Sequence, residues 1–71
     1  MKGELDAAIG YFREAVRYAP EAPDMHFNLG CALRAQNLST EAILEFKKAL
    51  RLRPNYTQAE ELLRTMEEKP R

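Results

Sequence analysis

Few side chains in this chain of 71 residues could carry out covalent chemistry, and their spacing favours none. The only histidine, His26, has no sequence neighbour that would complete a catalytic dyad, and residues 24–28 lack the spacing of metal ligands. The only cysteine, Cys31, has no Lys or His placed to lower its pKa, which predicts a packing role. There is no glycine-rich phosphate loop. We therefore expect a protein that is not an enzyme, with no catalytic residue, metal or cofactor.

The charged residues are balanced, which argues against two classes of partner. The chain has 11 Lys and Arg and 11 Asp and Glu, a net charge of zero. Proteins that bind nucleic-acid phosphates or anionic membrane surfaces normally carry a basic excess. We interpret the basic run over 47–53 as the favourable end of a helix dipole, and the acidic residues over 60–68 as a solvated helix face. We expect neither nucleic acid nor a membrane as a partner.

Nothing in the sequence predicts secretion or membrane insertion. No apolar run approaches the roughly 18 residues of a membrane helix, and MKGELDAAIG has no apolar signal-peptide segment. Small secreted domains usually contain several cysteines, whereas this chain has one. We expect a cytoplasmic location.

Apolar residues recur at three- and four-residue steps along the chain, which predicts helices and no strands. Pro20, Pro23 and Pro54 separate the helical segments, because proline ends helices and suits their first turn. The predicted helices span about residues 4–18, 24–35, 40–52 and 56–67. The short connections predict that consecutive helices are antiparallel neighbours.

Two helix starts have residues that favour capping. Ser39 is a candidate N-cap for the third helix. Asn55 and Gln58 have the spacing of a capping box for the fourth helix. We expect side-chain hydrogen bonds at both starts.

Gly30 stands in the middle of the second predicted helix. Glycine there costs about 1 kcal/mol relative to alanine. Such a glycine usually has a packing reason, so we expect another helix to come close at this point.

The chain matches itself when it is shifted by 34 residues. The matching positions are small or apolar residues, one arginine and one proline. The identical pairs are Ala8 and Ala42, Ile9 and Ile43, Phe12 and Phe46, Ala15 and Ala49, Arg17 and Arg51, and Pro20 and Pro54.

A helix-turn-helix unit with this period resembles the tetratricopeptide repeat. The residues that carry the resemblance are Leu29, Gly30, Leu33, Ala42, Phe46, Ala49 and Pro54. Two positions depart from the family pattern. His26 stands where the family usually has tryptophan, and Asn37 where a glycine usually opens the turn. The second change is mild, because asparagine tolerates a left-handed backbone.

The resemblance implies an all-α fold of four helices, with antiparallel hairpins stacked as a short right-handed α-solenoid of tetratricopeptide type. It predicts a single domain over 3–67 and a frayed tail over 68–71. Within that domain, 4–19 is the second helix of a partial repeat, 23–56 one complete repeat and 56–67 a capping helix. Arg64 and Glu67 in the last helix depart from the family pattern, which favours a cap over another repeat.

The resemblance also implies a protein-interaction scaffold that binds a peptide or helix in a concave groove, lined by the first helix of each pair. The candidate groove residues are Asp24, Phe27, Asn28, Cys31 and Arg34. An exposed aromatic beside an arginine is typical of a peptide anchor. An equally open alternative is that Phe27 packs against the fourth helix and that no partner binds there. A clamp for a chaperone's C-terminal carboxylate is not expected, because Gln58 and Leu62 stand where basic residues would be needed.

Two alternatives remain. Part of the first helix should be uncovered around Tyr11, Phe12, Val16 and Tyr18, so the chain could be a structural fragment that forms a homodimer through this face. It could also be a regulatory piece of a larger multidomain protein.

Overall fold

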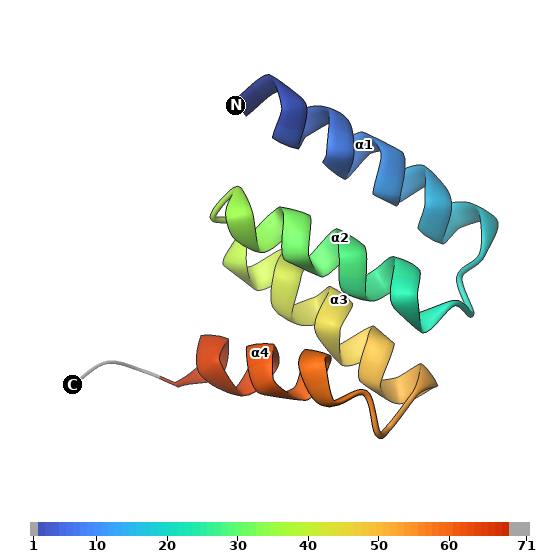
Figure 1. The fold of residues 1–71 in the computed structure, drawn as a ribbon, viewed down its shortest axis with the longest axis vertical. Coiled ribbons are helices and arrows are strands. Elements are labelled where there is room, and N and C mark those ends of the chain that lie inside the picture. The colour runs from blue at the N-terminus through green and yellow to red at the C-terminus, as the bar shows by residue number, and fades with distance from the viewer. Residues whose placement is uncertain (1, 69–71) are drawn as a thin grey trace.

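The computed structural model describes residues 2–68, which form four helices joined by short turns (Figure 1). The helices are α1 (Lys2–Tyr18), α2 (Pro23–Ala35), α3 (Ser39–Leu52) and α4 (Thr57–Glu67). No strand occurs among the described residues, so the expected all-α, four-helix class is confirmed. Of the tail expected over 68–71, Glu68 follows α4 with an extended backbone, and 69–71 lie outside the described residues.

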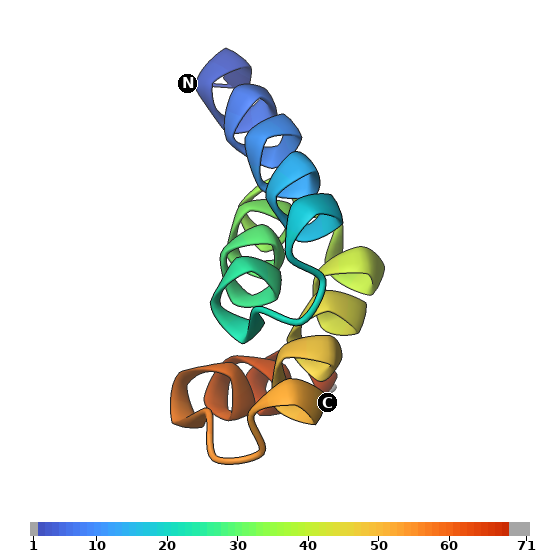
Figure 2. The same cartoon turned by 90° about the vertical axis from the view of Figure 1, so that its right-hand side faces the viewer.

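Each helix packs mainly on its neighbours in sequence: α1 on α2, α2 on α3, and α3 on α4. Consecutive helices run antiparallel (Figure 1). In the view turned by 90°, α2 and α4 lie toward one side of the molecule and α3 toward the other (Figure 2). The turns over 19–22, 36–38 and 53–56 are too short for any helix to pack elsewhere than beside its predecessor.

The helix starts differ in detail from the sequence prediction. Leu38 and Tyr56 occupy the N-cap positions of α3 and α4, and neither start has a side-chain capping hydrogen bond. The capping roles predicted for Ser39, Asn55 and Gln58 are therefore wrong. The reason is local, because the Leu38 carbonyl already accepts the Ala42 N–H at 2.9 Å and so places Ser39 inside the helix.

The end of α2 depends on a left-handed residue at the position where the family usually has glycine. Asn37 has φ of 67°, the one positive φ among the described non-glycine residues. The Leu38 N–H then donates to the Leu33 carbonyl at 2.9 Å, and the Asn37 N–H donates to the Arg34 carbonyl at 3.0 Å. These two bonds satisfy carbonyls at the end of α2 and turn the chain into α3.

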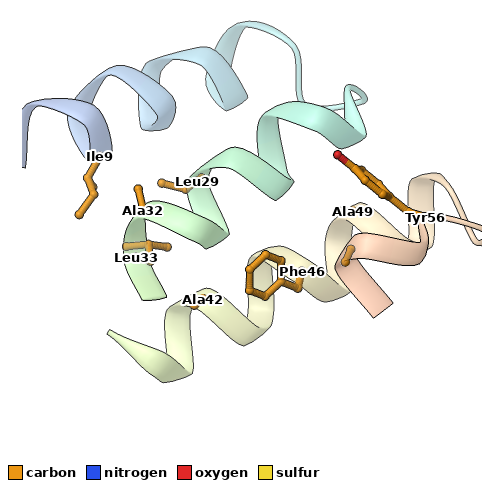
Figure 3. Packing of buried hydrophobic residues seen from close by; sticks show 9 residues of the cluster. Ile9, Leu29, Ala32, Leu33, Ala42, Phe46, Ala49 and Tyr56 are labelled. Carbon is orange, nitrogen blue, oxygen red and sulfur yellow. The ribbon is translucent and has the colours of Figure 1, made fainter. Parts of the chain in front are cut away.

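The core lies mainly between α2 and α3 (Figure 3). Its buried residues are Ile9, Leu29, Ala32, Leu33, Ala42, Phe46, Ala49, Tyr56 and Ala59. Phe46 has no exposed surface, and its ring lies against Gly30. A Cβ atom added at Gly30 would lie 2.7 Å from Phe46 Cε1, well inside van der Waals contact. The close helix approach predicted at Gly30 is therefore confirmed.

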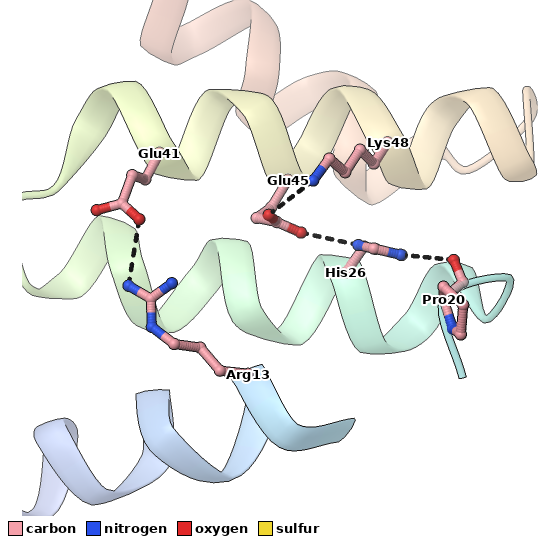
Figure 4. Close-up of polar contacts among 6 residues, drawn as sticks. All are labelled: Arg13, Pro20, His26, Glu41, Glu45 and Lys48. Carbon is pink, nitrogen blue, oxygen red and sulfur yellow. Dashed lines mark hydrogen bonds and ion pairs between the residues drawn. The ribbon is translucent and has the colours of Figure 1, made fainter. Parts of the chain in front are cut away.

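His26 is a buried polar residue at the same interface (Figure 4). Its Nε2 lies 2.7 Å from the Pro20 carbonyl oxygen, and its Nδ1 lies 2.8 Å from Glu45 Oε1. Because a carbonyl oxygen only accepts, Nε2 carries a hydrogen. The other Glu45 oxygen pairs with Lys48 at 3.4 Å. The side chain thus ties α2 both to α3 and to the turn that precedes α2.

The Gly30 contact gives a stability prediction. Gly30→Ala should lower the free energy of unfolding by about 1 kcal/mol, because crowding of the buried Phe46 ring outweighs the gain in helix propensity. The measurement is urea denaturation followed by circular dichroism.

Gly10→Ala is the matched control, since nothing lies within 4 Å of a Cβ atom added at Gly10 in the middle of α1. It should raise the free energy of unfolding by about 0.5–1 kcal/mol. Equal stabilisation by both substitutions would show that Gly30 is not required for packing.

Candidate functional site

All five residues predicted to line a binding groove lie on α2. Their exposures differ, because Asp24 and Arg34 are exposed while Phe27, Asn28 and Cys31 are half-buried. Asp24, Phe27, Cys31 and Arg34 follow one another at three- and four-residue steps, and Asn28 lies four residues after Asp24, so the five form one strip along the helix. The neighbouring strip of α2 is buried on α3 and consists of His26, Leu29, Gly30 and Leu33.

Phe27 packs against two aromatic rings at the edge of the core. Its ring stacks on the Tyr56 ring with centroids 5.0 Å apart and an interplanar angle of 28°. The Phe46 ring lies 5.7 Å away on a tilted plane. Since Tyr56 directly precedes α4, this stack joins the N-terminal half of α2 to the start of α4. Only the remaining surface of Phe27 is open to a partner.

Asp24 is also engaged, in a small polar cluster with Tyr56 and Arg53. The Tyr56 hydroxyl donates to Asp24 Oδ1 at 2.7 Å, and Arg53 Nη1 lies 3.4 Å from the same oxygen. The Arg53 guanidinium also lies 4.7 Å from the centre of the Tyr56 ring, in a cation–π contact. Asp24 therefore positions the start of α4.

Tyr56 and Arg53 were not predicted from the sequence as members of this site. One signal was available in the 34-residue shift, which aligns Tyr56 with Ala22. An aromatic side chain in place of alanine at that position indicates an additional contact, although not its partner.

The environment changes the acid–base properties of two side chains. Burial, together with the hydrogen bond and the negative charge of Asp24, raises the pKa of Tyr56 to about 12, whereas Arg53 opposes the shift. Burial also raises the pKa of the Cys31 thiol, against a smaller lowering by Arg34. Cys31 is accordingly a protonated, weakly nucleophilic side chain at neutral pH.

Arg34 differs from the other four residues. It is exposed and forms no hydrogen bond or ion pair with any other residue that the structure describes. Its guanidinium donors are therefore not used by another described residue, and Arg34 lies one turn along the helix from the half-buried Cys31.

Neither a metal-ligand cluster nor a membrane-spanning helix occurs among the described residues. Within residues 2–68, no three His, Cys, Asp or Glu side chains come close enough to hold a metal ion. Across the same residues, none of the helices combines the length and the apolar character needed to cross a membrane.

A family model described as tetratricopeptide repeat matches residues 2–57 of the chain. The chain belongs to the tetratricopeptide repeat family. The match covers the first three helices and ends at the first residue of α4. No curated protein matches the chain in the corresponding sequence comparison. Tetratricopeptide repeats are generally protein–protein interaction modules and typically have no catalytic activity.

The position of Tyr56 in this tetratricopeptide domain predicts a loss of stability at alkaline pH. A tyrosine whose pKa is higher in the folded protein stabilises the fold below its unfolded pKa of 10, and this contribution disappears as the pH rises toward about 12. The loss should amount to about 2 kcal/mol.

Comparison with Tyr56→Phe isolates this contribution, because lysines titrate alike in both proteins. Urea denaturation between pH 9 and 12 should show the stability advantage of the wild type shrinking as the pH rises. A constant difference over this range would show that ionisation of Tyr56 is not linked to folding.

Proposed function

We propose that this tetratricopeptide domain is a non-catalytic interaction scaffold that binds a peptide or helix of a partner protein along the open strip of α2. The observation that carries the proposal is the exposed guanidinium of Arg34, which forms no hydrogen bond or ion pair with another residue of 2–68 and lies near half-buried Cys31. The net charge of zero supports a protein rather than a nucleic acid as the partner.

The strip has three usable parts. Arg34 offers a planar fork of donors that suits a carboxylate. Asn28 offers an amide that can pair with a peptide backbone. Cys31 and the open part of Phe27 offer a short apolar surface between them. A partner segment with an acidic side chain next to an apolar one fits this order.

Asp24 has a different role from the one expected for a groove residue. Its carboxylate already accepts from Tyr56 and pairs with Arg53. We therefore assign it to holding α4 against α2, and the binding strip proper to Phe27, Asn28, Cys31 and Arg34.

The proposal can be tested with peptides selected from a random phage-displayed library on the wild-type domain. Arg34→Glu should weaken binding of the selected peptides by about tenfold or more, because an arginine anchor facing a carboxylate is a typical hot spot. Fluorescence anisotropy with labelled peptides measures the dissociation constants, and circular dichroism checks that helicity is retained.

Arg51→Glu is the matched control, since Arg51 is an exposed arginine that lies on α3 and not on α2. It should leave peptide affinity unchanged. Equal losses from both substitutions would indicate a general charge effect, and no loss from Arg34→Glu would contradict the proposed site.

A further inference from the structure

The 34-residue repeat leaves one helix at each end of the domain with an incompletely covered face. On α3, the residues Ala42, Phe46 and Ala49 are fully buried beneath α2. Their counterparts on α1 are Ala8, Phe12 and Ala15, and each is only half-buried. The neighbouring Tyr11 is 70% exposed. This face of α1 therefore resembles the α3 face without the helix that covers it.

The opposite end has the complementary face. Residues on α2 that pack against α3 have counterparts on α4, and these are Glu60, Leu63, Arg64 and Glu67. Together with Leu50 and Glu68 they line an open depression of about 510 Å³. This face of α4 is therefore the counterpart of the α2 face that packs on α3, but no helix of the described chain occupies the depression.

The polar groups of the two faces also match. Inside the domain, His26 of α2 contacts Glu45 of α3. The counterpart of His26, 34 residues later, is Glu60 on α4, and the counterpart of Glu45, 34 residues earlier, is Tyr11 on α1. A tyrosine hydroxyl donates and a carboxylate accepts, so this pair can form the corresponding hydrogen bond between two molecules.

A second match involves opposite charges. His26 borders a depression on α3 whose lining includes Lys48, Arg51 and Leu52. The shifted positions on α1 are Glu14, Arg17 and Tyr18, which line a depression of their own. The same relation places Glu60, the counterpart of His26, against Arg17, whose guanidinium also pairs with Glu14 of its own helix at 3.2 Å. Arg17 would therefore lie between two carboxylates, and its charge is complementary to Glu60 of the other face.

We propose that copies of this chain associate head to tail, with the Ala8–Phe12–Ala15 face of α1 in one copy seated on the α4 depression of the next. The contact is heterologous, because it joins two different faces, and it reproduces between molecules the packing of α2 on α3.

Arg64 limits the strength of this association. It stands at the counterpart of Gly30, where an added Cβ atom would lie 2.7 Å from the aromatic ring. Its side chain therefore keeps the Phe12 ring of the neighbouring copy at a greater distance than Phe46 keeps from Gly30. Weak association also agrees with an interface built from a single helix on each side.

Sedimentation velocity over a concentration series up to about 1 mM tests the proposal on the whole chain, since weak interfaces associate only at high concentration. The sedimentation coefficient of the wild type should rise with concentration. Arg17→Glu and Glu60→Arg should each lower the association constant about fivefold, and an equimolar mixture of the two variants should restore it. Leu44→Glu, an exposed apolar residue of α3 outside both faces, should have no effect.

A substitution at Arg64, the counterpart of Gly30, provides a second, independent measurement. Arg64→Gly should raise the association constant at least about fivefold, because it removes the side chain that separates the helices. Thr65→Gly is the matched control, since it introduces the same backbone freedom on the adjacent, exposed position of α4 and should not strengthen association.

Three results would overturn the proposal. The first is a monomer at every concentration for both the wild type and Arg64→Gly. The second is self-association that Glu60→Arg does not weaken, which would indicate a symmetric dimer through α1 alone. The third is a failure of the mixed charge variants to recover association.

Discussion

The ring of Phe46 occupies the space that a side chain at position 30 would fill, and the arrangement of the helices depends on that contact. Because Gly30 has no Cβ atom, α2 comes close enough to α3 for the alanines on either side of Phe46 to be buried completely. Leu29 and Leu33 are then also enclosed, and together these residues form most of the core. The glycine costs helix propensity, but the apolar area buried around it is worth more.

α2 contacts the other helices on several sides and also contains the proposed binding strip. One side is buried on α3, another is covered by α1, and its N-terminal half is joined to the start of α4 by the Phe27–Tyr56 stack and the Asp24 cluster. What remains open is a narrow strip ending at Arg34. The proposed binding strip is thus held by contacts on three sides, so little ordering of its residues would be needed if a partner bound there.

Features determined by neighbouring residues could be predicted from the sequence. The helical period is of this kind and was confirmed, and Asn37 adopts the left-handed backbone that asparagine tolerates. Gly30 indicated that another helix comes close, which was confirmed, but not that Phe46 is the side chain in contact. Contacts between distant residues could not be predicted: the His26–Glu45 bond spans 19 positions and the Tyr56–Asp24 bond spans 32. The cap predictions failed for a different reason, because several polar residues near each start suit the role and small backbone shifts decide among them. The family resemblance therefore indicated the helix of the candidate site, but not which of its residues are already engaged.

The main contacts join each helix only to its neighbours along the chain, and this has a kinetic consequence. Chains dominated by local contacts close short loops and fold rapidly. Folding of this domain should begin with the α2–α3 hairpin, which has the most complete packing, and spread outward to α1 and α4. Opening should follow the reverse order, so amide hydrogens in the terminal helices should exchange with solvent sooner than those around Phe46. We therefore expect a gradient of local stability, with the most stable part around Phe46 and the two faces proposed for self-association on the less stable terminal helices.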